Sequence, residues 1–97
     1  MKYQLIAKAI SQKKSLAFLY DGYERIAEPH HIGIMNNHIC IHAFQVAGVS
    51  IKGGLPNWRN FLVDKIINLK VLNTSFARQP SYNPAGSHYQ EIYFSVD

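Results

Sequence analysis

The chain of 97 residues has the length of one domain, and 47% hydrophobic residues with 16% charged residues exclude a largely disordered protein. Its formal net charge of +4 favours anionic partners such as nucleic acid, nucleotides or acidic metabolites. The single cysteine excludes an internal disulfide. Because neither a signal peptide nor a long apolar segment is found, we expect a cytoplasmic protein without membrane contact.

The first predicted element is a helix at the start of the chain. Its apolar residues recur at helical spacing on one face, whereas the lysines fall elsewhere. The apolar positions are Leu5, Ile6, Ala9 and Ile10. The polar run SQKKS then ends the helix.

Two tight turns organise the next part of the chain. Asp21-Gly22 favours a hairpin between strands at residues 15–20 and 23–35, because such turns need positive φ angles. Asn36-Asn37 is a second turn, since asparagine tolerates the left-handed region. Pro29 cannot donate to a ladder and marks a bulge, an edge or a bend. The remaining predicted segments are a strand at 38–46, a glycine-containing loop at 48–57, a strand at 58–63, a tight turn at 64–66 and a strand at 67–72.

One helix and five mostly antiparallel strands predict a mainly β fold, namely a small five-stranded barrel of SH3 or Sm type. The barrel and its N-terminal helix occupy residues 1–76. Residues 77–97 form a C-terminal extension with a loop and a strand-like tail, in which Ile92, Phe94 and Val96 alternate with other residues. This tail is either a sixth strand or an arm that pairs with a second molecule.

The two turns also predict how the strands face one another. Two-residue loops pair Phe18 with Arg25 and His31 with His42. Alternation then assigns one face to the core, formed by Ala17, Leu19, Ile26, Ile32, Ile34, Ile39, Ile41 and Ala43. The opposite face carries Phe18, Tyr20, Tyr23, Arg25, His31, His38, Cys40 and His42. A bulge at Pro29 would place Arg25 and His31 on different faces.

The polar face has two interpretations. Aromatic rings beside a cation and imidazoles can stack bases while neutralising phosphates or carboxylates. Alternatively, the aromatics receive the N-terminal helix and Arg25 is a solvated or salt-bridged surface cation. Arg59 shares its strand side with Phe61 and either faces a ligand or caps carbonyls at the end of the barrel. Lys65, at the turn, is expected to be solvated.

No metal site and no catalytic site is predicted. His38, Cys40 and His42 alternate along one strand, so their Cα atoms are about 6.8 Å apart and do not converge easily on zinc. Neither a nucleophile with an oriented base, nor a carboxylate pair, nor a phosphate-binding loop is found. The expectation is a protein that is not an enzyme and has no cofactor.

Residues from about Leu5 to Phe76 resemble the WYL domain, a small Sm/SH3-like barrel module of bacterial regulators that usually follows a winged helix-turn-helix. The resemblance rests on Tyr20, Arg25 and Pro29 and on the run Arg59-x-Phe61-x-x-Asp64-Lys65-Ile66. The three letters that name the family fall on Ile39, Cys40 and Ile41.

This resemblance implies a non-enzymatic sensor module of transcriptional regulation. It would bind an anionic or nucleotide-like small ligand, or single-stranded nucleic acid, through a basic groove flanked by aromatic residues. The resemblance assigns Arg25 and Arg59 to the anion and Tyr20 to the same site, while His42 enters from the strand register. The alternative function is protein interaction or homodimer formation through the C-terminal segment, and a third is pH or metal sensing by histidines.

Overall fold

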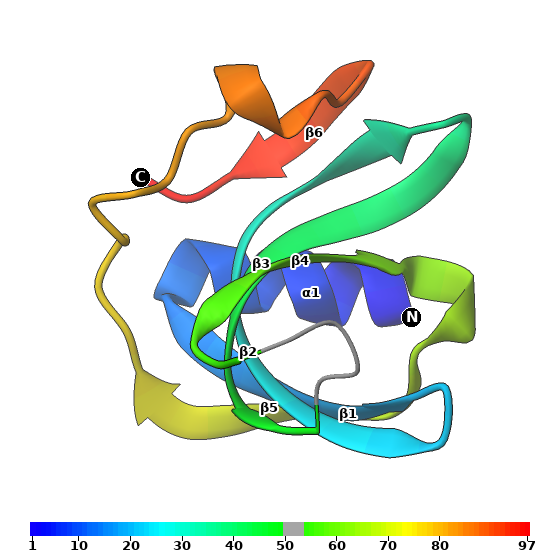
Figure 1. Ribbon diagram of the computed structural model, residues 1–97, viewed down its shortest axis with the longest axis vertical. Coiled ribbons are helices and arrows are strands. Elements are labelled where there is room, and N and C mark those ends of the chain that lie inside the picture. The colour runs from blue at the N-terminus through cyan, green and yellow to red at the C-terminus, as the bar shows by residue number, and fades with distance from the viewer. Residues whose placement is uncertain (50–53) are drawn as a thin grey trace.

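The computed structural model describes residues 1–49 and 54–97, so part of the predicted loop at 48–57 lies outside the described residues. The chain begins with one helix and continues with strands and two short 3-10 turns (Figure 1). In chain order these are α1 (Lys2–Gln12), β1 (Lys14–Tyr20), β2 (Tyr23–Met35), β3 (His38–Gly48), β4 (Asn57–Leu62), η1 (Val63–Lys65), β5 (Ile67–Ser75), η2 (Ala85–Ser87) and β6 (Glu91–Ser95).

The strands form one antiparallel sheet in the order β4-β3-β2-β1-β5, and β6 pairs with β2. Within residues 1–49 and 54–97, no ladder joins β4 to β5, so the sheet is open. The prediction of a mainly β chain with an N-terminal helix is confirmed. The C-terminal segment forms a sixth strand that pairs within its own chain.

Both predicted hairpin turns are present, and their residues adopt positive φ angles. Asp21 and Gly22 have φ of 53° and 80°, and Asn36 and Asn37 have 51° and 65°. The register that follows from these turns is confirmed. Phe18 pairs with Arg25, and His31 pairs with His42.

The predicted core face is correct on one side of Pro29 and wrong on the other. Ile32, Ile41 and Ala43 are buried in the core as expected. On β1, however, the side chains of Leu16, Phe18 and Tyr20 point inward in place of Ala17 and Leu19, and Arg25 and Ala27 accompany them from β2. Of the remaining residues expected in the core, Ile26 and Ile34 are half-buried and Ile39 is exposed.

A β-bulge in β2 causes this inversion. Pro29 pairs with Ala43 and His31 pairs with His42, which leaves His30 as an extra residue in β2. Because side chains alternate along a strand, one extra residue moves every side chain on the N-terminal side of the bulge to the opposite face of the sheet. Arg25 therefore lies on the core side, away from the face of His31.

The N-terminal helix closes the core by packing against β1, β2, β5 and β6. Ile6, Ala9 and Ile10 are fully buried, and Lys13 in the left-handed conformation ends the helix. The Lys2 ammonium donates hydrogen bonds to the carbonyls of Val63 and Ile66, which ties the helix to the η1 turn. None of the helices in the described ranges is long and apolar enough to cross a membrane.

The C-terminal extension contacts the sheet in two ways: its aromatic residues pack on the face of His31 and His42, and β6 pairs with β2 at the sheet edge. Backbone hydrogen bonds run from Gln90 N–H to the Ile34 carbonyl (2.7 Å) and from Val96 N–H to the His30 carbonyl (2.8 Å). Gly33 permits this close approach, because a Cβ atom there would overlap the carbonyl oxygen of Glu91. The helix therefore lies on one face of the sheet, residues 77–90 pack on the other at His31 and His42, and β6 extends the sheet beside β2 and also contacts the helix.

Candidate functional site

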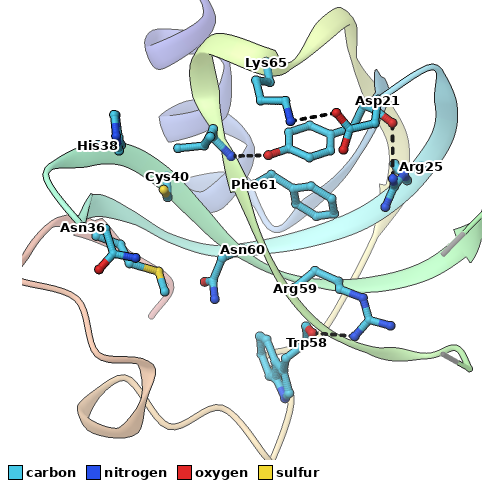
Figure 2. Close-up of a pocket in the computed structure, with 13 residues that line it drawn as sticks. Asp21, Arg25, Asn36, His38, Cys40, Trp58, Arg59, Asn60, Phe61 and Lys65 are labelled. Carbon is cyan, nitrogen blue, oxygen red and sulfur yellow. Dashed lines mark hydrogen bonds and ion pairs between the residues drawn. The ribbon is translucent and has the colours of Figure 1, made fainter. Parts of the chain in front are cut away.

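A pocket of about 610 Å³ opens around the edge strand β4 (Figure 2). It receives side chains from the β1–β2 turn, the β2–β3 hairpin, β4 and η1. Among the described strands β4 pairs with β3 alone, and residues from both faces of β4 line the pocket. Its lining comprises Tyr20, Asp21, Arg25, Met35, Asn36, His38, Cys40, Trp58, Arg59, Asn60, Phe61, Leu62 and Lys65.

Arg25 lies in the wall of this pocket with only 5% of its surface exposed. Its guanidinium donates to two neutral oxygens, the Tyr20 carbonyl at 3.2 Å and Gln45 Oε1 at 3.4 Å. Nε has no hydrogen-bond partner. Among the described residues, no carboxylate forms an ion pair with Arg25. The interpretation of Arg25 as a solvated or salt-bridged surface cation is therefore wrong, since the bulge at His30 turns it inward.

The rings of Tyr20 and Phe61 form an aromatic wall next to this guanidinium. The guanidinium carbon of Arg25 lies 5.5 Å from the centre of the Tyr20 ring and 5.7 Å from that of Phe61. The Tyr20 and Phe61 rings pack edge to face with centroids 4.9 Å apart. The Tyr20 hydroxyl accepts a hydrogen bond from the Leu62 backbone N–H at 3.0 Å. Both ends of the tyrosine are thus fixed, and its ring cannot turn away from Arg25.

Arg59 enters the pocket from β4. It pairs with Ala43 on β3 and shares its strand side with the buried Phe61. Its Nη1 donates to the Trp58 carbonyl at 2.9 Å, so this half-buried cation both lines the pocket and caps a strand carbonyl. Figure 2 shows Arg59 and Arg25 on the same side of Phe61. The structure therefore brings Tyr20, Arg25 and Arg59 together.

Lys65 is exposed to solvent, as expected, and it also forms an ion pair. Its Nζ lies 2.7 Å from Asp21 Oδ1 and 4.9 Å from the centre of the Tyr20 ring. The two charged side chains are 47% and 45% exposed, and pairs this exposed contribute little to stability. The ion pair spans the rim of the pocket between the β1–β2 turn and η1, and the sequence pattern gave no signal for it.

His42 does not line the pocket. Its side chain lies on the face of the sheet opposite to the face that carries Arg25. Its ring stacks on Trp58 with centroids 4.8 Å apart and planes 3° apart, and on His31 at 4.9 Å and 18°. His42 Nδ1 lies 2.8 Å from Asn60 Oδ1. The structure therefore separates His42 from the three other predicted site residues, although its partners Trp58 and Asn60 line the pocket.

His30, His31 and His42 form a second cluster, here called the histidine stack. Burial lowers the pKa of all three from the ordinary value of 6.5. For His31, burial and then the neighbouring His42 and His30 lower the pKa to about 3. The Asn60 hydrogen bond partly offsets the effect of burial on the pKa of His42. At neutral pH these imidazoles are uncharged, so they offer no positive charge to an anion.

The described part of the chain contains no group of three or more His, Cys, Asp or Glu side chains arranged to hold a metal ion. The buried Cys40 thiol lines the pocket, and burial raises its pKa, which keeps it protonated and weakly nucleophilic at neutral pH. The pocket chemistry is therefore dominated by two guanidiniums beside aromatic rings.

Comparisons of the chain with protein-family models, with curated proteins and with solved structures gave no match.

Proposed function

We propose that the chain is a non-enzymatic binding module that recognises an anionic, nucleotide-like small ligand in the pocket around β4. The observation that carries this proposal is the state of Arg25. Its guanidinium is buried in the pocket wall, and among the residues that the structure describes it bonds to neutral oxygens only and its Nε has no partner.

The energetics of a buried charge support an anionic ligand. Moving a charged group out of water costs several kcal/mol even after relaxation, and the cost is recovered only by good partners. The Tyr20 and Phe61 rings offset part of it through cation–π attraction, on the order of 1–2 kcal/mol. A phosphate or carboxylate would complete the set, because the planar guanidinium binds such groups through two parallel hydrogen bonds.

The pocket dimensions and the second cation favour a small ligand over a long polymer. A volume of about 610 Å³ lies within the range of small-molecule sites, which span about 300–1,000 Å³. Arg59 supplies a second guanidinium, and Tyr20, Phe61 and Trp58 supply aromatic lining. A nucleoside monophosphate combines an anion for the guanidiniums with a flat ring for the aromatic groups.

The small SH3- or Sm-like barrel and the WYL-type sensor role belong to the same proposal. Their support is the order of the strands, with the N-terminal helix closing the core, and the placement of Arg25 and Arg59 at one pocket. Both arginines belong to the residues that carry the family resemblance. The role inferred is regulatory, with the ligand state of the pocket read by a partner protein.

Calorimetric titration at low salt tests this function with adenosine monophosphate, adenosine and a short single-stranded oligonucleotide. The proposal expects the monophosphate to bind and uncharged adenosine to bind far more weakly. Arg25→Met should abolish binding, whereas Lys70→Met, which removes an equal charge from the exposed surface of β5, should not. If only the oligonucleotide binds, with an affinity that falls steeply with salt, the ligand is nucleic acid instead. If no anion binds at low salt, the proposal is wrong.

Self-association is a second candidate function, favoured by the exposure of β6. Ile92, Tyr93 and Phe94 are 37%, 43% and 39% exposed, and in the described part of the chain β6 pairs on one edge, with β2. An apolar edge strand of this kind is a template for pairing with a second copy. Light scattering should then show a dimer that Phe94→Lys dissociates and Tyr23→Lys, at the far end of β2, does not. A wild-type monomer at all concentrations would contradict this candidate.

A further inference from the structure

The histidine stack lies beneath the first part of the C-terminal extension, residues 77–90, here called the tail cover. The Tyr82 hydroxyl lies 2.6 Å from His31 Nδ1, and the Tyr89 ring packs edge-on against His31 at 4.3 Å. The tail cover is also held by the bond from the Trp58 indole N–H to Ser81 Oγ at 3.0 Å. Docking of the tail cover thus depends directly on the rings of the stack.

The hydrogen bonds of His30 require a neutral imidazole. Nδ1 lies 2.9 Å from the carbonyl oxygen of Glu28, which can only accept, so the proton is on Nδ1. Nε2 then carries a lone pair and accepts the backbone N–H of Gln79 at 3.1 Å. A second proton on Nε2 would make this nitrogen a donor that faces the Gln79 N–H, which is also a donor. The hydrogen bond between His30 and the tail cover would then be lost.

His31 also lacks a place for a second proton, and His42 is stacked against it. His31 Nε2 is buried without a hydrogen-bond partner, so a charged His31 would leave one N–H unsatisfied. His42 donates from Nδ1 to Asn60, because a carboxamide oxygen only accepts, and its ring stacks on His31. Charging both stacked rings would place two like charges in contact within a buried site.

No neighbouring group compensates such a charge. The titratable and charged groups that face the stack are Glu28 on β2, Cys40 on β3 and Arg78, Tyr82 and Tyr89 on the tail cover. Glu28 accepts a hydrogen bond from the Gln79 side chain, and Arg78 opposes a positive charge on His30. Burial raises the pKa of Tyr82 and of Tyr89, so both phenols are neutral. In the described part of the chain, no carboxylate is bonded to an imidazole of the stack.

We propose that the histidine stack is an acid-operated latch, in which proton uptake by His30, His31 and His42 releases the tail cover while the core of β1, β2 and the helix stays folded. The docked cover keeps the imidazoles buried, which lowers their affinity for protons. Release exposes them to water, where their proton affinity returns to its ordinary value. Release is therefore driven by falling pH.

The direction and steepness follow from linkage. The docked pKa values are lowered from 6.5, so docking is fully favourable above 6.5 and weakens as the pH falls below it. Each histidine that is protonated only in the released state changes the docking equilibrium by about tenfold per pH unit. For His31 this dependence extends down to its docked pKa of about 3.

Release would also alter the pocket. Asn60 accepts from Tyr89 Oη at 2.9 Å as well as bonding to His42, and Trp58 bonds to Ser81, while both residues line the pocket. Loss of the tail cover removes these restraints from β4. The effect of acid on ligand affinity rests on the proposed function, whereas the latch itself requires no ligand.

Hydrogen exchange of the full chain without ligand tests the latch, with amide protection corrected for the pH dependence of intrinsic exchange. Protection of the Gln79 and Tyr82 amides should stay constant from pH 7.5 to 6.5 and then fall, reaching about tenfold or more per pH unit toward pH 5, with the β1–β2 ladder protected throughout. Constant protection of the cover, or an equal loss in cover and ladder, would overturn the proposal. His31→Phe keeps a stacked ring that cannot take a proton and should move release to lower pH, whereas His88→Asn, at an exposed left-handed position, should not.

A measurement on the unaltered chain keeps the test open if His31→Phe fails to fold. NMR titration of the histidine Cε1 protons should show the three rings of the stack gaining protons only as the Gln79 and Tyr82 amides lose protection. Titration of those rings near pH 6.5 with the cover amides still protected would refute the latch. Neither result depends on anion binding, so the failure of one proposal is distinguishable from the failure of the other.

Discussion

Arg25 is held by Tyr20 twice: its Nη2 donates to the Tyr20 carbonyl at 3.2 Å, and its guanidinium carbon lies 5.5 Å from the centre of the Tyr20 ring. The Tyr20 hydroxyl in turn accepts the Leu62 backbone N–H, which attaches the same tyrosine to the edge strand β4. One aromatic residue therefore fixes both the buried cation and the strand around which the pocket opens. The aromatic side of the Arg25 site is therefore already formed in the protein without a ligand.

Arg25→Met should remove anion binding without unfolding the protein. Replacing a buried charge that lacks an ionic partner by an apolar side chain of similar length is often neutral or stabilising. We expect the free energy of unfolding in urea to stay within about 1 kcal/mol of wild type or to rise. A loss of more than about 2 kcal/mol would show that Arg25 serves the fold through its hydrogen bonds and ring contacts.

Tyr20→Phe should weaken the attachment of β4. The change leaves the partly buried Leu62 N–H without its acceptor, which costs about 1–3 kcal/mol in free energy of unfolding. The matched change Tyr23→Phe removes a hydroxyl from an exposed tyrosine on β2 and should alter stability by less than about 0.5 kcal/mol. Equal effects of the two changes in urea denaturation would show that the Tyr20–Leu62 hydrogen bond contributes nothing.

The global stability of the chain should fall on acidification. Because the folded pKa values of His30, His31 and His42 lie below the unfolded value of 6.5, the unfolded chain binds more protons below that pH. The free energy of unfolding should be constant above 6.5 as far as these groups are concerned and decrease from 6.5 toward 4. Chemical denaturation at several pH values measures this slope, and His31→Phe should reduce it. A slope identical in wild type and variant would contradict the assignment.

Gly33→Ala should detach β6 from β2. A Cβ atom at Gly33 would overlap the carbonyl oxygen and carbon of Glu91, which are backbone atoms that cannot rotate away. We expect NMR signals of β6 to lose their sheet-like dispersion while those of the β1–β2 hairpin persist. Gly22→Ala is the comparison: its added Cβ meets no neighbouring atom, although its φ of 80° makes it unfavourable for another reason. Unchanged β6 signals in Gly33→Ala would refute the tight approach.

Local sequence signals predicted the elements and the register well. Asp21-Gly22 and Asn36-Asn37 specify turns that need positive φ, and they fix the pairing of β1 with β2 and, between the second turn and the bulge at His30, that of β2 with β3. These signals act over a few residues, so they are readable without knowledge of the fold. They account for the confirmed pairing of His31 with His42.

Which face of the sheet each side chain occupies could not be predicted equally well from the sequence, because one bulge reverses the assignment. Pro29 marked the place, yet a proline is compatible with a bulge, an edge or a bend, and only the first of these moves Arg25 inward. The hydrogen bond from Arg25 to Gln45 Oε1 and the ion pair of Lys65 with Asp21 each join residues that are far apart in sequence. Sequence spacing carries no information about such contacts.

The cover over the histidines was missed for a related reason. The segment of Tyr82 and Tyr89 is rich in proline, serine and asparagine, a composition typical of an exposed loop. Its aromatic residues nevertheless pack on His31 and His42, which removes His42 from the predicted binding face. The two tyrosines of the segment were visible in the sequence, but they specify no docking partner.

The most direct test of the central claim is to follow the Nε–H NMR signal of Arg25 during titration with adenosine monophosphate. In the free protein this donor has no partner, so an anion held by the guanidinium should shift its resonance and slow its exchange with water, saturating with the calorimetric affinity. Adenosine should leave the signal in place. An Arg25 signal that stays unchanged while the monophosphate saturates the protein would contradict the account.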